Sequence, residues 1–284
     1  MISTARGRAV NGDYEIEYDV HGDSGGRPLL LVNGFMSQMI SRPEELCRQL
    51  CARDFRVVRY DNRDVGLSTK TPPGAPDYTL SDMAADGVAV LDALGIDRAH
   101  VAGTSMGGMI VQVMAIEHPD RVASLCSIMS TTGDRSVGGA SDEAMVALRT
   151  PPPSERAGYI EHAVATGRLV SGTRFDEAAA RELAGASYDR CFHPEGALRH
   201  MAAIMAAPDR TEALRRLDVP TLVVHGRLDP LIRLDGGEAT AAAVPDAELV
   251  VLDEMGHDLP EFVWPELVDR LDALATRAGS ARAG

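Results

Sequence analysis

The sequence predicts an α/β domain with a mainly parallel, twisted sheet that is flanked by helices and interrupted once. Three observations predict it. Buried apolar runs of strand length alternate with helical patterns over residues 1–130, the alternation stops over residues 131–217, and it resumes over residues 218–284. Strands that are joined through helices pair in parallel by right-handed crossovers. We therefore expect residues 1–130 and 218–284 to form one core domain, with residues 131–217 inserted as a helical cap.

Five strands are predicted in the first segment. YEIEYDV at 14–20 alternates apolar and polar residues, as a half-exposed strand does. RPLLLVNG at 27–34 is a continuous apolar run, which is typical of a strand buried on both faces. The same interpretation applies to FRVVRYD at 55–61, AHVAGTS at 99–105 and RVASLCSIMS at 121–130.

Helices are predicted between these strands. In SRPEELCRQLCAR at 41–53, Ser41 and Glu44 fit a capping box at the start of an amphipathic helix. YTLSDMAADGVAVLDALGI at 78–96 carries an apolar stripe at helical spacing, and MGGMIVQVMAIEH at 106–118 is an apolar helix.

The second half begins with the insertion. It carries the loop signals SVGGAS, TPPPSERA and SGTRFDE, and short helical patterns such as FDEAAARELAGAS. The alternation then returns as a strand at 219–226, a helix at 234–244, a strand at 247–254 and a helix at 259–278. The C-terminal GSARAG, residues 279–284, is expected to fray.

Composition excludes several classes of function. The net charge of −14 disfavours binding to nucleic acid and to anionic membranes. The four cysteines form neither a metal knuckle nor a disulfide framework, so we expect them to be reduced. With no apolar signal segment at the N-terminus and no stretch of membrane-spanning length, a cytoplasmic location is expected. No metal or cofactor motif is found, and a homodimer remains an open possibility.

The stretch HVAGTSMGGMIVQ, residues 100–112, places Ser105 between Gly103 and Gly107, where a buried strand meets an apolar helix. A serine hydroxyl is a weak nucleophile unless a base takes its proton. A strand, a serine and a helix with small residues on either side form a nucleophile elbow, which lifts the hydroxyl towards the positive end of the helix dipole. The alternative is a glycine-rich turn with an incidental serine, and the flanking elements disfavour it.

A base and an acid are found at the same predicted edge of the sheet. His257 follows the last predicted strand, at the carboxyl edge where open α/β sheets hold their sites. Asp229 follows the preceding strand and is placed to accept the second imidazole N–H. His225 also ends a strand, Asp253 is the chief rival acid because it is close to His257 in sequence, and Asp134 is a weaker one.

An oxyanion hole requires two N–H donors beside the nucleophile. Met106 directly follows Ser105 and provides one. Phe35 is expected to provide the other, because Gly34 allows the backbone after the 27–34 strand to turn towards the serine. An ordinary tight turn at Asn33-Gly34 is the minor alternative.

Taken together, LVNGF, YDNRDVGLS, GTSMGG, HGRLDP and MGHDLP resemble the α/β-hydrolase superfamily, and most closely serine esterases near the aclacinomycin methylesterase group. That group removes methyl esters from polyketide-type carboxylates. The resemblance implies an α/β-hydrolase fold with Ser105 as nucleophile, His257 as base and Asp229 as orienting acid. It also implies Phe35 and Met106 as oxyanion donors and a cap over the pocket.

Two positions depart from the common family pattern. Asn33 stands where histidine is frequent, and Asp64 stands where glycine is usual. Neither change removes a catalytic part, but both leave the substrate branch open.

These features predict a carboxylic ester hydrolase that works through an acyl-enzyme on a small-molecule ester. Numerous methionines near the predicted site loops favour an adaptable apolar pocket, although some of them are expected to fill the core. A methyl ester or another ester of an apolar or polycyclic acid is therefore the expected substrate. The same triad could support cofactor-free haloperoxidase-like perhydrolase or lactonase activity, and a non-catalytic ligand-binding fold is a weaker alternative.

Overall fold

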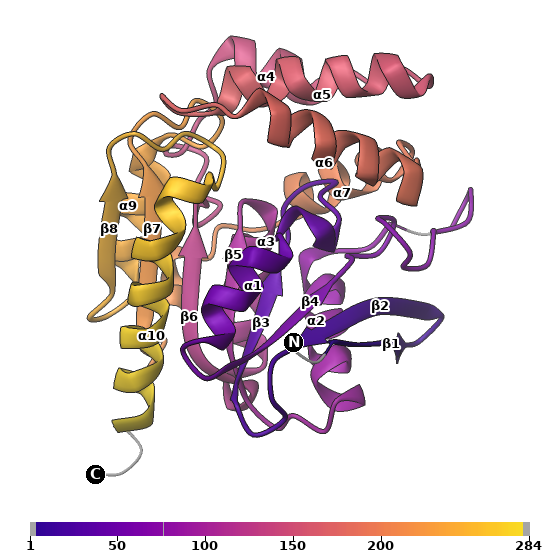
Figure 1. The fold of residues 1–284 in the computed structure, drawn as a ribbon. Helices are drawn as coiled ribbons and strands as arrows, with labels where there is room; N and C mark the ends of the chain where they lie inside the picture. The colour runs from indigo at the N-terminus through magenta and orange to yellow at the C-terminus, as the bar shows by residue number, and fades with distance from the viewer. Residues whose placement is uncertain (1–3, 76, 281–284) are drawn as a thin grey trace.

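The computed structural model describes residues 4–75 and 77–280, and it contains one eight-stranded sheet (Figure 1). The strand order is β1-β2-β4-β3-β5-β6-β7-β8. The strands are β1 (Thr4–Asn11), β2 (Tyr14–His21), β3 (Arg27–Val32), β4 (Phe55–Tyr60), β5 (Ala99–Thr104), β6 (Val122–Ile128), β7 (Thr221–Gly226) and β8 (Glu248–Leu252). Only β1 with β2 and β2 with β4 pair antiparallel, which confirms the mainly parallel sheet.

Ten α-helices accompany the sheet within the described residues. They are α1 (Glu44–Cys51), α2 (Leu80–Ala93), α3 (Met106–Glu117), α4 (Asp142–Arg149), α5 (Arg156–Val170), α6 (Glu177–Arg190), α7 (Gly196–Ala206), α8 (Thr211–Leu214), α9 (Leu234–Ala243) and α10 (Trp264–Ser280). Short 3-10 helices lie at Met39–Ser41, Pro119–Arg121 and Glu261–Val263. The expected fraying of residues 279–284 is wrong for Gly279 and Ser280, which continue α10, and residues 281–284 lie outside the described part of the chain.

The sheet is buried on both faces by these helices. Along β3, Leu29 and Leu31 pack in the apolar cluster that includes α1 and α10, whereas Leu30 and Val32 pack in the cluster that includes α2 and α3. Successive residues of a strand point to opposite faces, so a continuous apolar run is what a doubly covered strand requires. Helices packed on both faces hold the strands in place, and the candidate site lies at the carboxyl edge of this sheet.

The chain between β6 and β7 forms helices α4 to α8. Residues 129–220, all of which the structure describes, contain no strand. Helices α4 to α7 lie above the carboxyl edge of the sheet (Figure 1). Helix α8 instead packs beside the end of α9, through Leu214, Ala243 and Val244.

The predicted capping box at Ser41 and Glu44 is wrong. Helix α1 begins at Glu44 with Pro43 as its N-cap, and no side chain caps it. Ser41 instead donates a hydrogen bond to the Asn33 side chain at 3.1 Å, because the two residues lie side by side at the end of β3. A tertiary contact therefore occupies the hydroxyl that local sequence would assign to the helix.

Two further features bear on the composition. Cys47, Cys51, Cys126 and Cys191 are all free thiols. Within the described residues, no helix combines the length and the apolar character that crossing a membrane requires.

Candidate active site

Ser105 lies in the turn between β5 and α3, with a backbone conformation that is unusual for any residue other than glycine. Its φ is 56° and its ψ is −122°. Such a conformation costs of order 1–3 kcal/mol and persists only where the surroundings hold it. Here the Ser105 N–H donates to the Ile128 carbonyl at 2.9 Å, and the Ser130 hydroxyl donates to the Ser105 carbonyl at 2.8 Å.

The glycines on either side of the serine are required by close backbone approach. A Cβ at position 103 would lie 2.0 Å from the Gly107 carbonyl oxygen, and one at position 107 would lie 2.2 Å from the Val32 carbonyl oxygen. Neither contact can be relieved by a side-chain rotation, because both partners are backbone atoms. The G-x-S-x-G spacing is therefore dictated by the packing of α3 against β5 and β3.

Ser105, His257 and Asp229 lie within hydrogen-bonding distance of one another in the order predicted. The Ser105 Oγ lies 2.9 Å from the His257 Nε2, and the His257 Nδ1 lies 2.7 Å from the Asp229 Oδ2. The Asp229 side chain is fully buried and the His257 side chain is 9 % exposed. With the proton on Nδ1 donated to the carboxylate, Nε2 is free to accept the serine proton.

Asp229 is itself held by the turn that follows β7. Its Oδ1 accepts the N–H groups of Leu231 and Ile232 at 2.8 and 2.9 Å. His225 lies beneath it, with Nε2 at 2.8 Å from the Ile232 carbonyl oxygen. Burial lowers the pKa of His225, so this second histidine is neutral and donates through Nε2. The carboxylate therefore has one oxygen for the backbone and one for His257.

The rival acids lie elsewhere. Asp253 forms an exposed ion pair with Arg227 at 2.6 Å, and Asp134 accepts the N–H and hydroxyl of Ser136 at 2.8 Å each. Because each carboxylate already has a different partner, neither Asp253 nor Asp134 takes the position beside His257.

The segment after β3 approaches the nucleophile at Gly34, the residue before Phe35. Gly34 approaches so closely that a Cβ there would lie 3.1 Å from the Ser105 Cβ. The Ser37 N–H donates to the Gly34 carbonyl at 3.2 Å, which closes a tight turn over Phe35 and Met36. Met36 adopts a φ of 52°, as the third residue of a type II turn does. Met106, the residue after Ser105, begins α3.

A buried histidine of α7 supports this turn. The Met36 N–H donates to the His200 Nδ1 at 3.3 Å, and the His200 Nε2 donates to the Arg63 carbonyl at 2.9 Å. Burial lowers the pKa of His200 to about 4, so the ring is neutral and can accept at Nδ1. Helix α7 thus contacts the turn that carries Phe35.

No metal-binding arrangement accompanies these residues. Among residues 4–75 and 77–280, no group of three or more His, Cys, Asp or Glu side chains could hold a metal ion. The chemistry that the side chains allow is proton transfer between serine and histidine, oriented by a carboxylate.

The sequence profile of the alpha/beta hydrolase fold family matches residues 27–262. This chain belongs to the α/β-hydrolase fold family. The α/β hydrolase is similar to rhodomycin D methylesterase DnrP from Streptomyces peucetius, with 30% identity over 91% of this chain and 94% of that protein. It is also similar to 2-hydroxymuconate semialdehyde hydrolase from Pseudomonas putida, with 28% identity over 84% of this chain and 83% of that protein.

A solved structure gives the same result for the fold. The esterase RhEst1 from Rhodococcus sp. ECU1013 matches the α/β hydrolase with a TM-score of 0.78 and 26% identity. The match covers 95% of this chain and 98% of that one. The predicted fold and the resemblance to methylesterases of this superfamily are therefore confirmed.

The structure also explains the two departures from the usual family sequence. Asp64 has a φ of 64°, a conformation that favours glycine, and its carboxylate compensates by accepting the Thr71 N–H and hydroxyl at 2.5 and 2.9 Å. Asn33 is 1% exposed and accepts the Ser41 hydroxyl, so it serves as a structural amide beneath the turn.

The sequence did not reveal the side chains that hold the segment after β3, some of which come from the inserted helices. Asp61, Arg190, Gln38 and His200 are far apart along the chain, and only Asp61 lies in a motif that the sequence makes visible, YDNRDVGLS. That motif indicates family membership, whereas its physical role lies in the contacts that Asp61 makes with Met39 and Arg190, which are distant in the sequence.

Proposed function

We propose that this α/β hydrolase cleaves a carboxylic ester through an acyl-enzyme, with Ser105 as the nucleophile. The observation that carries the proposal is the continuous chain of hydrogen bonds from Ser105 through His257 to the buried Asp229. A serine at 105 also suits acyl chemistry, because alkyl-transferring hydrolases need a carboxylate nucleophile at the elbow.

The proposed reaction has two steps, acylation of Ser105 and hydrolysis of the acyl-enzyme. The Ser105 oxygen attacks the ester carbonyl while its proton passes to Nε2 of His257, and the Asp229 carboxylate stabilises the imidazolium. The N–H groups of Phe35 and Met106 hold the oxyanion of the tetrahedral intermediate. When the intermediate collapses, the alcohol leaves with the proton from His257. A water molecule then attacks the acyl-enzyme by the same route, and it releases the acid and restores Ser105.

The proposed substrate class follows from the relatives and from the covering helices. The methylesterase from Streptomyces peucetius is 30% identical over nearly the whole chain. We assign residues 131–217 as the cap, with helices α4 to α7 over the carboxyl edge of the sheet. A methyl ester, or another ester of an apolar or polycyclic acid, is the substrate that these features support.

The decisive experiment compares the wild-type enzyme with Ser105→Ala. We expect the variant to lose about 10⁴-fold or more in kcat on p-nitrophenyl esters and on methyl esters of bulky acids. A fluorophosphonate should label the wild-type protein at Ser105, as located by peptide mass spectrometry, and should leave the variant unlabelled. Undiminished ester hydrolysis by Ser105→Ala would refute the proposal.

A further inference from the structure

The loop that follows β4 contains a carboxylate that is completely buried beneath the inserted helices. Asp61 is 0% exposed. Its Oδ1 accepts the Met39 N–H at 2.8 Å, and its Oδ2 accepts the Leu67 N–H at 2.9 Å. The Ser68 hydroxyl donates to the Asp61 carbonyl at 2.6 Å, which closes the loop around the carboxylate.

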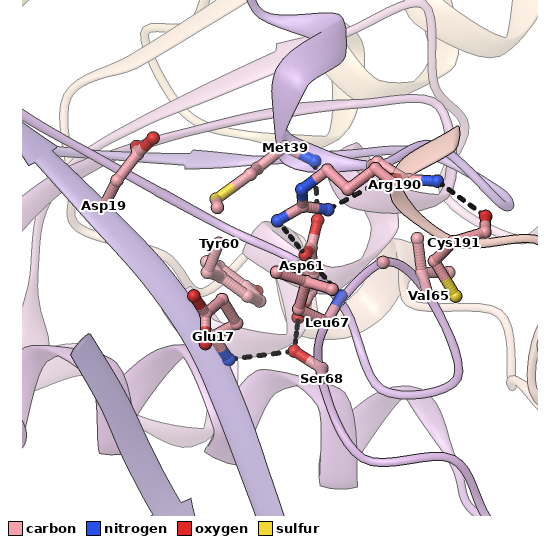
Figure 2. Close-up of polar contacts among 12 residues, drawn as sticks. Glu17, Asp19, Met39, Tyr60, Asp61, Val65, Leu67, Ser68, Arg190 and Cys191 are labelled. Carbon is pink, nitrogen blue, oxygen red and sulfur yellow. Dashed lines mark hydrogen bonds and ion pairs between the residues drawn. The ribbon is translucent and has the colours of Figure 1, made fainter. Parts of the chain in front are cut away.

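The charge that balances this carboxylate comes from α6, one of the inserted helices that pack over the loop after β4. Figure 2 shows Arg190 reaching across to Asp61, where the contacts from Met39 and Leu67 also converge. Nη2 of Arg190 lies 2.7 Å from Oδ2 of Asp61. A buried carboxylate is tolerated only when such a partner is present, so this part of the core depends on α6 for its neutrality.

Arg190 also contacts the segment that carries Phe35. Its Nη1 donates to the Gln38 Oε1 at 2.8 Å. The Gln38 Nε2 in turn donates to the carbonyls of Ser187, in the last turn of α6, and Cys191, its C-cap residue, at 2.7 and 3.0 Å. The amide of Gln38 is therefore fully used by the C-terminal end of α6. It adds a second donor to the Ser187 carbonyl, which already accepts the Cys191 N–H, and it gives the Cys191 carbonyl a partner.

The space for these contacts is reserved by a glycine. A Cβ on Gly66 would lie 2.1 Å from the Asp61 Oδ2 and 2.4 Å from the Arg190 Nη1. Gly66 also has a φ of 52°, which disfavours other residues. Asp61 and Gly66 of the YDNRDVGLS motif thus form a binding site for the Arg190 side chain.

We propose that Arg190 is a positioning residue for the oxyanion loop, residues 34–39, which it holds through Asp61 and Gln38. One end of this loop continues from β3, and the other is fixed by the Asp61 contact to the Met39 N–H and the α6 contacts of Gln38. Phe35 lies between these anchors, three residues before Gln38. Arg190 therefore fixes the direction of the Phe35 N–H without touching the substrate, and this role rests on the proposed function of that N–H.

Removing the Arg190 side chain should displace part of the oxyanion loop. Without the guanidinium, Asp61 becomes an unpaired buried charge and the Gln38 oxygen loses its donor. The most direct relief is for residues 38 and 39 to move away so that water reaches the carboxylate. An oxyanion donor that shifts by about 1 Å costs up to about 100-fold in rate, whereas ground-state binding of a short ester is hardly affected.

The test measures kcat and KM separately for Arg190→Met on p-nitrophenyl butyrate. We expect kcat to fall by about 10- to 100-fold, with KM within about twofold of the wild-type value. Affinity for an alkyl trifluoromethyl ketone, which adds to the serine as a tetrahedral alkoxide, should fall by a similar factor. A purely structural role would lower activity only in proportion to the unfolded fraction, which circular dichroism measures on the same samples.

Arg156→Met is the matched control. Arg156 also belongs to the inserted helices and forms a bidentate pair with Asp189 at 2.7 Å, but this pair is exposed and does not contact the oxyanion loop. We expect its kcat to stay within about twofold of wild type, as for other exposed ion pairs. If Arg190→Met does not fold, Gln38→Met replaces it, because that change removes the contacts that Gln38 makes with Arg190 and the end of α6 and leaves the Asp61–Arg190 pair in place.

The proposal is overturned if the folded Arg190→Met, or Gln38→Met in its place, retains the wild-type kcat, or if kcat and the folded fraction fall together. It is equally overturned if Arg156→Met loses as much kcat. Ser105→Ala separates this failure from failure of the proposed function. An inactive Ser105→Ala beside a fully active Arg190→Met refutes only the positioning role, whereas an active Ser105→Ala refutes the proposed function itself.

Discussion

Replacing Asp229 with asparagine tests the proposed acid, because the surroundings dictate how the new amide must orient. Oδ1 of Asp229 accepts two backbone N–H groups, from Leu231 and Ile232. Turning the amide nitrogen towards them would leave two buried donors unsatisfied, at about 1–3 kcal/mol each. The amide oxygen therefore keeps that position, and the NH₂ group faces Nδ1 of His257.

This orientation forces the wrong tautomer on the imidazole. With an N–H donor facing it, Nδ1 of His257 must accept, so the ring proton moves to Nε2 and points at the Ser105 oxygen 2.9 Å away. The ring can then no longer take the serine proton. We expect kcat to fall by about 10⁴-fold, equivalent to about 5 kcal/mol of transition-state stabilisation, in a protein that remains folded.

The assay is the kcat of Asp229→Asn on p-nitrophenyl butyrate, together with ¹⁵N NMR of the histidine tautomers and the rate of fluorophosphonate labelling. Asp253→Asn is the matched control, since that carboxylate is exposed and paired with Arg227. We expect the control to keep its kcat within about twofold, as for other exposed pairs. An Asp229→Asn enzyme within about tenfold of wild type, or an equal loss in Asp253→Asn, would refute the reasoning.

Two further predictions concern stability. Gly103→Ala places a Cβ 2.0 Å from the Gly107 oxygen, so its free energy of unfolding in urea should fall by about 3 kcal/mol or more. Gly25→Ala, where a Cβ meets nothing within 4 Å, should change it by less than about 0.5 kcal/mol, and equal effects would contradict the close-packed turn. Burial lowers the pKa of His200 from 6.5 to about 4, against a smaller raising effect from its hydrogen bond to Arg63. Between these pH values the unfolded chain binds a proton that the folded chain does not, so this histidine should remove about 3 kcal/mol of stability as the pH falls through that window. In His200→Gln, the free energy of unfolding in urea should fall by about 3 kcal/mol less than in the wild type between pH 6.5 and 4. If the variant loses as much stability as the wild type over this range, His200 does not cause the pH dependence.

Much of the candidate site could be predicted because its requirements are local. Glycines two residues before and after Ser105 are demanded by a turn of five residues, so their spacing is visible in the sequence. The alternation of strands and helices also places the carboxyl ends of β5, β7 and β8 at one edge. Any serine, aspartate or histidine in the loops that follow these strands is then brought close to the others.

Other parts of the site depend on contacts between distant residues. Asp229 and Asp253 both follow strands and both precede His257, and the chain pattern alone leaves either available. The choice is made by the turn after β7, which offers Asp229 two backbone N–H donors, and by Arg227, which binds Asp253 at the surface. Ser41 shows the same effect, because its hydroxyl contacts Asn33 instead of capping α1.

A mainly parallel α/β sheet, a helical interruption and three candidate catalytic side chains after strand ends could be predicted from the sequence alone, because periodicity and tight turns are properties of neighbouring residues. The tertiary structure alone decided that Arg190, 129 positions from Asp61, supplies the charge that this buried carboxylate requires. Burial makes an unpaired charge costly, and which residue compensates it is settled only when the inserted helices pack over the oxyanion loop.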